Sequence, residues 1–326
     1  MRYWKYIIFT LVFFSCQKED YDNVSNQEVF KSMWAFVDEH YVYFDYKNVN
    51  WDEVKQDYEL RITDNISDED FFIICLEMLS ELRDGHNRLS GPYDFRENYN
   101  YQEGYDIHFN DTLIRENYLN NDFEVAGNYT YGLIDDDIGY VHFKKFRGVG
   151  NISKVVEFMD QENVEGLIFD VRDNSGGSGQ NAVEIVGHFI NDGITVGYIY
   201  EKKGPAHDDF TEALSVTAKP KMPFLDIPVM LLTNRNSFSA TSFLAGQMTA
   251  LENVTHIGQI TGGGGGGNTT YELPNGWLVT VSTNRFQDAS FKEIEDGVIP
   301  DILIENDQNT LLNGVDQMLE RAISEF

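Results

Sequence analysis

Short apolar runs alternate with helical patterns between residues 138 and 258, and this alternation restricts the fold more than any other feature of the sequence. The apolar runs predict strands at 138–143, 166–171, 195–200, 229–232 and 254–258. Helices are expected between them, at 152–159, at 181–190 and after residue 239. Strands that alternate with helices build an α/β core with parallel pairing. In such sheets, sites form outside the carboxyl ends of the strands.

The chain before this core favours helices. Ser25 and Glu28 form a capping box, which predicts a helix over 26–40 with an apolar side. A second helix is expected at 52–62, and a third begins at Ser67. These patterns predict a small helical unit at the start of the folded chain.

The remaining signals set the expected domain boundaries. Gly85 has the position of a C-terminal cap for the third helix. We therefore expect an N-terminal helical domain at 26–90 and a core domain at 91–326. Within the core domain, an Asn-Gly turn predicts a hairpin at 269–283, and 310–323 predicts a closing helix.

The first residues have the features of a targeting segment. Basic residues precede an apolar stretch at 6–14, which is too short to span a bilayer and ends in Phe-Phe-Ser-Cys. This resembles a bacterial lipoprotein signal, in which Cys16 is lipidated and becomes the mature N-terminus. The resemblance implies a signal peptide at 1–15, a tether at 16–25 and an outer-membrane lipoprotein that faces the periplasm or the cell surface. The alternative is an ordinary cleaved secretory peptide.

Composition restricts the possible partners. The formal net charge is -30, so nucleic acid and anionic membrane surfaces repel the chain. No His-Glu-x-x-His, Cys-x-x-Cys or EF-hand spacing occurs, so we expect neither a metal site nor a cofactor. Without residues 1–15, only Cys75 remains as a free thiol beside Cys16, which allows no internal disulfide.

A candidate nucleophile follows the apolar run at 229–232. A polar break leads into small residues that include Ser237, Ser239 and Ser242, and a helix begins there. A serine on such a turn lies at the positive end of a helix, beside free backbone N–H groups. That placement suits a nucleophile whose reaction develops an oxyanion. Alternatively, the three serines are only caps and turn formers.

His86 is the candidate base. Among the seven histidines, it is the one at a turn flanked by groups that orient an imidazole. The alternative is a surface histidine favoured by the helix dipole. Two glycine-rich stretches follow core strands, at 170–177 and at 262–267. The glycines of the first let the backbone approach a ligand closely, and the second also fits a flexible loop.

Together these stretches resemble the tail-specific (C-terminal processing) serine peptidase family, and more closely its tricorn-core and interphotoreceptor-retinoid-binding-protein-like branch. The matching pieces are Leu82-Arg-Asp-Gly-His86, Ile138-Gly-Tyr-Val141, Asp170-Val-Arg-Asp-Asn-Ser-Gly-Gly177, Asn236-Ser-Phe-Ser-Ala-Thr-Ser242, Val254 to Gly258 and Glu295-Asp-Gly-Val-Ile-Pro-Asp301. The resemblance implies a ClpP/crotonase-like ββα core with the helical domain against it. The segment 90–137 lacks the glycine loop of a PDZ domain, so none is expected.

The resemblance also implies roles for individual residues. Ser239 would be the nucleophile, His86 the base and Glu295 the residue that helps to orient the base. The oxyanion donors would be the backbone N–H of Ala240 and that of Gly176 or Gly177.

The sequence departs from the family in two places. The Ser/Lys branch has its lysine near the position of Gly264, where this chain has only glycines, so a Ser-Lys dyad is not expected. The serine that precedes the histidine in the tricorn type is Gly85 here. Asp84, Asn87 and Ser90 are the candidates to replace it.

We therefore expect a membrane-anchored serine peptidase that hydrolyses peptide bonds of peptide or protein substrates. In this hypothesis, Gly263, Gly264 and Gly265 belong to a mobile loop that closes over the bound peptide and lends it N–H groups. The alternative function is a catalytically silent binding protein for a peptide or an apolar ligand.

Overall fold

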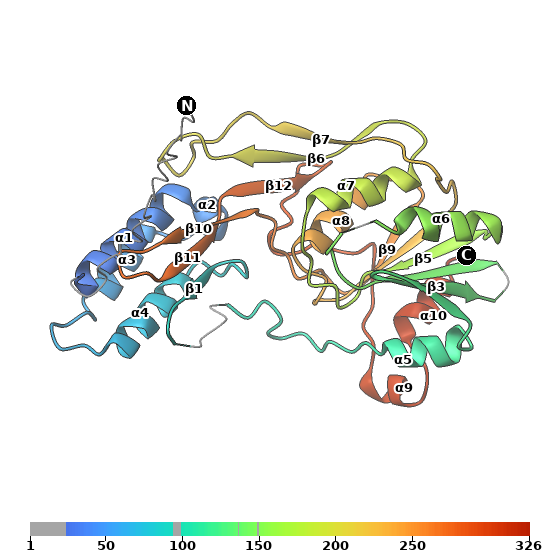
Figure 1. Cartoon of the computed structure of the whole chain (residues 1–326), viewed down its shortest axis with the longest axis horizontal. Coiled ribbons are helices and arrows are strands. Elements are labelled where there is room, and N and C mark those ends of the chain that lie inside the picture. The colour runs from blue at the N-terminus through green and yellow to red at the C-terminus, as the bar shows by residue number, and fades with distance from the viewer. Residues whose placement is uncertain (1–23, 94–98, 136, 149) are drawn as a thin grey trace, which may run out of the picture.

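The computed structural model describes residues 24–93, 99–135, 137–148 and 150–326. The expected signal peptide, Cys16 and nearly all of the tether lie outside these residues. Figure 1 shows an elongated molecule, with a helical unit at one end and a large sheet at the other, joined by long strands. No helix in the described part of the chain has the length and apolarity needed to cross a membrane.

The large sheet has seven strands in the order β13-β9-β8-β5-β4-β3-β2. Pairing is parallel from β13 to β4, and β3 and β2 continue the sheet antiparallel. The strands are β2 (Phe123–Ala126), β3 (Tyr129–Ile134), β4 (Ile138–Phe143), β5 (Gly166–Asp170), β8 (Val229–Thr233), β9 (Val254–Gly258) and β13 (Ile302–Leu303). The α/β prediction is confirmed, and four of the five strands expected from the apolar runs lie in this sheet.

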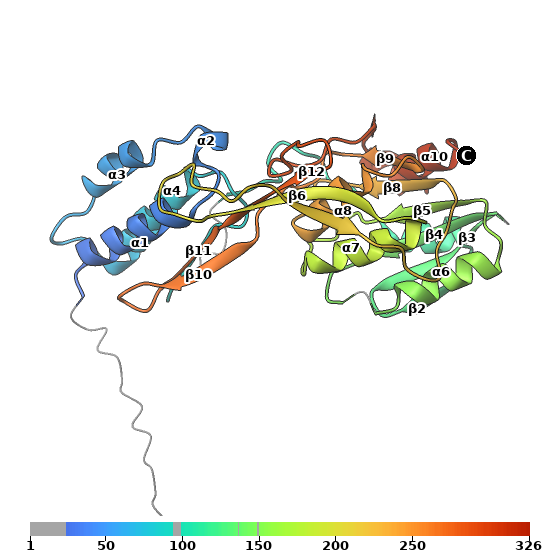
Figure 2. The same cartoon turned by 90° about the horizontal axis from the view of Figure 1, so that it is seen from above.

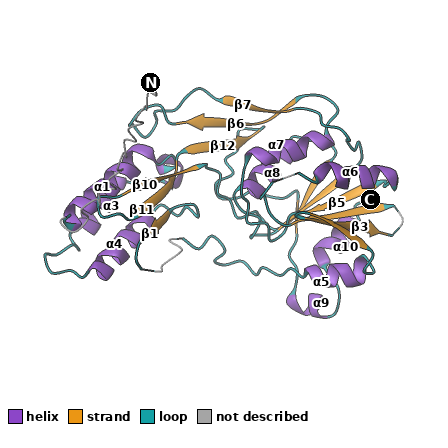
Figure 3. Ribbon diagram, viewed as in Figure 1, coloured by secondary structure: helices purple, strands orange, loops and turns teal. Residues whose placement is uncertain are grey.

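Helices cover both faces of the sheet (Figures 1 and 3). One face packs Leu167 and Phe169 of β5 against α6 (Ile152–Gln161), α7 (Gln180–Val186) and α8 (Ala240–Met248). The other face packs Ile168 of β5 against α5 (Asp111–Leu113), the π-helix Ile114–Tyr118, α9 (Gln308–Leu312) and α10 (Gln317–Ile323). Neighbouring residues of one strand thus enter different cores, as the alternation of side chains along a strand requires.

The helical unit does not follow the expected boundary at residue 90. Its helices are α1 (Asn26–His40), α2 (Phe44–Lys47), α3 (Trp51–Glu59) and α4 (Asp68–Ser80). They pack against a sheet of β1 (Arg88–Ser90), β11 (Leu278–Ser282) and β10 (Asn268–Glu272). The expected hairpin therefore exists, but Trp277 and Val279 lie in the core of the helical unit.

A third sheet joins the two ends of the molecule, as Figure 2 shows. Its order is β12-β6-β7, with β6 (Ile194–Glu201), β7 (Leu214–Ala218) and β12 (Asn284–Asp288) all antiparallel. The strand expected at 195–200 is therefore present but does not belong to the parallel sheet. Its partly exposed pattern differs from the fully buried β5 and β8.

Two of the expected helices are divided. A 3-10 turn at Gly187–Phe189 follows α7 within the helix expected at 181–190. The closing helix is broken between α9 and α10, where Gly314 takes a φ of 88°. Backbone at that angle cannot continue an α-helix, and glycine adopts it without steric cost.

Candidate active site

Ser239 lies on the sharp turn between β8 and α8, at the N-terminal end of the helix. Its backbone has φ 59° and ψ -120°, a conformation that is rare for a residue with a side chain. A hydrogen bond from its N–H to the Gly263 carbonyl, 2.8 Å long, helps to hold it there. Strain of this kind persists only where the surroundings fix it, and it is concentrated at functional sites.

The three serines of this segment have different partners. Ser237 Oγ donates to the Val171 carbonyl, and Ser242 Oγ donates to the Ser237 carbonyl, so both are buried structural residues. Ser239 Oγ makes no cap and instead lies 2.9 Å from His86 Nε2. The alternative of caps and turn formers therefore describes Ser237 and Ser242 and not Ser239.

The segment that carries His86 follows α4 in an irregular path. The helix ends at Ser80, and Arg83 rather than Gly85 takes the left-handed backbone conformation, so the cap expected at Gly85 is wrong. A Cβ at Gly85 would lie 3.0 Å from the rings of both Phe238 and Tyr101. Glycine at this position lets Phe238 approach the His86 ring, at 4.9 Å between ring centroids.

Burial lowers the pKa of His86. Asp84 opposes this shift, and Arg88 adds to it. Asp84 Oδ1 accepts a hydrogen bond of 2.8 Å from the His86 backbone N–H, and its Oδ2 accepts one from Ser282. His86 Nδ1 has no hydrogen-bond partner among the described residues. The candidates to replace the serine of the tricorn type are Asp84, Asn87 and Ser90. Of these three, Asp84 is the one whose side chain bonds to the His86 backbone.

If His86 acts as a general base, its burial should affect how the rate of the reaction falls at low pH. A general base must be neutral, and the ordinary histidine pKa is about 6.5. Because the pKa of His86 is lowered, we expect kcat/KM to stay constant down to a pH below 6.5 and only then to fall. Asp84→Asn should move this fall to still lower pH, since it removes a charge that stabilises the imidazolium. A midpoint above 7 in the native chain would contradict this assignment.

Glu295 is buried, with 3% of its surface exposed, and it does not bond to His86 among the described contacts. Its Oε2 accepts a hydrogen bond of 2.8 Å from the Gly265 N–H, and its carbonyl accepts one from Gly264. Lys47 Nζ, from α2, lies 3.4 Å from Oε1. Burial and the nearby Asp84 raise the pKa of Glu295 well above its usual range. Glu295 therefore contacts the glycine run directly. It can influence His86 only indirectly, through the glycines that lie between the two residues.

The glycine run differs from the expected mobile loop. Gly263, Gly264 and Gly265 are buried, and the N–H groups of Gly264 and Gly265 already bond to Glu295. A Cβ at Gly264 would lie 2.7 Å from Phe238 and 2.9 Å from His86 Cε1. The lysine of the Ser/Lys branch is expected near Gly264. In this chain the rings of His86 and Phe238 fill the space that such a side chain would need. The glycines of this run that line the pocket are the next two, Gly266 and Gly267.

Two of the three expected oxyanion donors have free N–H groups. The Gly176 N–H donates to Asn174 Oδ1 over 3.0 Å, so it is already used within the protein. The N–H groups of Ala240 and Gly177 have no acceptor among the hydrogen bonds of the described residues. Gly176 packs against the Ala240 nitrogen and the Ser239 side chain, which places this loop beside the serine.

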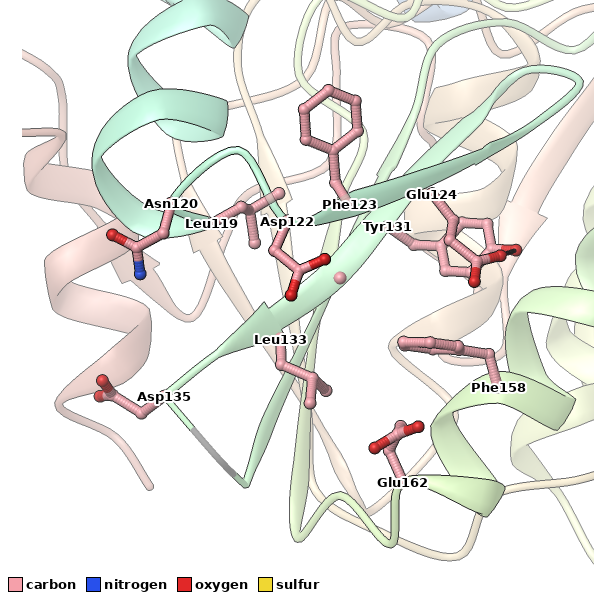
Figure 4. A pocket seen from close by; sticks show the side chains of 11 residues that line it. Leu119, Asn120, Asp122, Phe123, Glu124, Tyr131, Leu133, Asp135, Phe158 and Glu162 are labelled. Carbon is pink, nitrogen blue, oxygen red and sulfur yellow. Dashed lines mark hydrogen bonds between the residues drawn. The ribbon is translucent and has the colours of Figure 1, made fainter.

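A pocket of about 430 Å³ adjoins Ser239 and His86. Apolar side chains from several elements form its walls: Val183, Ile199, Val216, Phe243 and Phe286. A larger pocket of about 590 Å³ lies between β2, β3 and α6. Figure 4 shows its acidic lining, with Asp122, Glu124 and Glu162, and it contains no serine, cysteine or histidine among the described residues. Of these two pockets, only the first has the chemistry of a nucleophile and a base.

Known proteins resemble the chain over nearly its whole length. A crystal structure of a candidate peptidase from Parabacteroides merdae is 36% identical, covers 93% of this chain and 96% of its own, and has a TM-score of 0.87. The photosystem II D1 C-terminal processing protease has the same fold, with 16% identity, coverage of 86% and 94% and a TM-score of 0.56. Carboxyl-terminal-processing peptidase 2 of Arabidopsis thaliana is 28% identical over 50% of this chain and 31% of its own. The chain spans about a third of the length of such curated relatives.

Family models match two stretches of the sequence. The tricorn protease C1 domain matches residues 23–80, the region of the N-terminal helices. The peptidase family S41 matches residues 137–304, which contain most of the large sheet, the serine turn and Glu295. Because this second match covers more than half of the chain, the protein belongs to peptidase family S41.

Proposed function

We propose that this protein is a serine peptidase in which Ser239 is the nucleophile and His86 the general base. The observation that carries the proposal is the 2.9 Å distance between Ser239 Oγ and His86 Nε2, at a strained helix N-terminus. An apolar pocket lies directly beside this pair, so a substrate side chain can bind next to the reacting atoms. The substrates are peptides or proteins, in keeping with the C-terminal processing activity named for the relatives.

The reaction follows from these positions. Ser239 Oγ attacks the scissile carbonyl carbon while its proton passes to His86 Nε2. The carbonyl oxygen gains the negative charge and accepts hydrogen bonds from the N–H groups of Ala240 and Gly177. Collapse breaks the C–N bond, and His86 returns the proton to the leaving amine. Water then hydrolyses the acyl-enzyme by the same steps, with His86 again as the base.

Glu295 and Asp84 are positioning residues in this mechanism. Glu295 fixes Gly264 and Gly265, and Gly264 lies against the Cε1 edge of the His86 ring. Asp84 fixes the His86 backbone and places a negative charge near the imidazolium that forms. Asp84 thus supplies a negative charge near the imidazole through its bond to the His86 backbone N–H and not through a bond to Nδ1.

The geometry favours catalysis over silent binding. A binding protein has no need for a strained serine whose Oγ lies on an imidazole nitrogen, whereas a nucleophile needs both features. Covalent labelling by a fluorophosphonate separates the two functions, because only an activated serine reacts with it. Labelling that is lost in Ser239→Ala supports the peptidase, and its absence in the native chain supports the binding protein.

We also propose that a lipid on Cys16 anchors the protein to the outer membrane. If so, Cys16→Ala should release the protein from the membrane fraction or block its maturation, because one residue carries the whole anchor. Fractionation of cells and the mass of the mature N-terminal peptide measure this. Membrane retention and processing identical to those of the native chain would contradict the proposal.

A further inference from the structure

One face of α8 connects Ser239 to the far end of the pocket. Ser239, Phe243 and Gln247 are spaced four residues apart, and all three line the pocket. Phe243 and Gln247 therefore lie along the same side of α8, and Ser239 directly precedes the first residue of the helix. Eight residues of helix measure about 12 Å, so Gln247 lies well beyond the nucleophile along this face. Side chains of an α-helix generally lean toward its N-terminus, so we expect the Gln247 amide on the Ser239 side of its own Cα.

The lining selects against charged side chains. None of the described residues around this pocket is lysine, arginine, aspartate or glutamate, and Val183, Ile199, Val216, Phe243 and Phe286 give it apolar walls. Burial of an unpaired charge among such walls is strongly unfavourable. The volume of about 430 Å³ accommodates a large side chain. A bulky uncharged residue therefore fits this space.

Four side-chain amides line the pocket, and Gln247 is the buried one, whereas Gln180, Asn268 and Asn284 are exposed or half-buried. Gln247 is 2% exposed, and its Oε1 has no hydrogen-bond partner among the described residues. Buried amides are normally hydrogen-bonded, so a group supplied by a ligand would complete the site. A phenol both donates and accepts a hydrogen bond, and it therefore matches an amide in either orientation.

We propose that this pocket binds the side chain on the acyl side of the scissile bond, and that Gln247 gives it a preference for tyrosine. The inference rests on the proposed function and adds the substrate class to it. Phenylalanine fills the same apolar space but leaves the Gln247 amide unpaired. Tyrosine should therefore be cleaved faster than phenylalanine, since sites built to bond a hydroxyl discriminate against the analogue that lacks it.

The test uses two peptides that differ only in tyrosine or phenylalanine before the cleaved bond. For the native chain we expect kcat/KM to be about tenfold higher with tyrosine, which is the effect that one net hydrogen bond gives. In Gln247→Leu the ratio should fall to about one or below, because leucine keeps the volume and removes the amide. Gln180→Leu is the matched control. Gln180 lies at the exposed rim of the same pocket, and this variant should keep the tyrosine preference.

The outcomes separate this inference from the proposed function. Equal cleavage of both peptides by a native chain whose Ser239 is labelled by a fluorophosphonate overturns the tyrosine preference alone. A tyrosine preference that persists in Gln247→Leu overturns the assignment to Gln247. If Ser239 is not labelled and neither peptide is cleaved, both proposals are wrong. Should Gln247→Leu fail to fold, Gln247→Met provides the same comparison, with the loss of preference expected.

Discussion

Replacement of His86 by alanine is expected to lower kcat by about 10⁴-fold or more, with the fold unchanged. Loss of one member of a nucleophile–base pair removes most of its contribution, because neither residue acts without the other. His86 is the proposed base and lies within reach of Ser239, and its ring and that of Phe238 fill the space beside Gly264. Steady-state hydrolysis of a peptide measures the loss, and circular dichroism checks the fold.

His207→Ala is the control for this variant. His207 lies in the chain between β6 and β7, where its Nε2 is 2.9 Å from Asp38, and it does not line the pocket. The control should therefore keep the native kcat. If His86→Ala kept it as well, the base would be another group and the mechanism would be wrong.

Gly263→Ala is expected to lower the free energy of unfolding by about 2–5 kcal/mol, from backbone strain together with overpacking. Gly263 has φ 82°, and a Cβ there would overlap the Glu295 carbonyl oxygen. Because the Gly263 carbonyl also accepts the Ser239 N–H, peptide hydrolysis should fall together with stability. Urea unfolding and the rate of hydrolysis measure the two effects.

Gly104→Ala separates the two causes. Gly104 has nearly the same φ, 83°, but its Cβ would meet nothing within 4 Å. We expect this control to cost about 1–2 kcal/mol, from the backbone conformation alone, and to leave hydrolysis unchanged. Equal losses of stability in the two variants would mean that the close packing around Gly263 contributes nothing, and the overpacking explanation would be wrong.

The sequence predicts those elements whose stability is local or whose burial is complete. The fully buried runs at 138–143 and 229–232 are nearly continuous apolar segments, and each is a central strand. The capping box of Ser25 and Glu28 needs only neighbouring residues, and it is present as expected. Such features are fixed by the nearby sequence, so one chain is enough to identify them.

Features that depend on distant partners are not evident from the pattern. The strand at 195–200 is amphipathic, but nothing in its own residues indicates that β12 is its neighbour. The hairpin at 269–283 lies within the expected core domain in sequence but packs with α4, a contact between segments about 200 residues apart. Six consecutive glycines predict mobility, yet here they allow close packing of the chain against Glu295, Phe238 and His86.

In the candidate site, too, the sequence predicts some features, and others depend on contacts between distant segments. The order of the motifs identifies Ser239 and His86, but only the structure gives the distance between them. It also shows that the Gly176 N–H is occupied and that the backbone N–H of His86 bonds to Asp84. Side-chain contacts of this kind depend on rotamers and packing, which spacing in the sequence does not determine.

The most direct test of the Ser239–His86 pair is to map the site of a fluorophosphonate adduct. We predict one adduct on Ser239 in the native chain, found by mass spectrometry of the digested protein, and none in Ser239→Ala. His86→Ala should react far more slowly, because the serine then lacks its base. An unlabelled native chain, or an adduct on Ser237 or Ser242 instead, would contradict the claim that Ser239 and His86 form the catalytic pair.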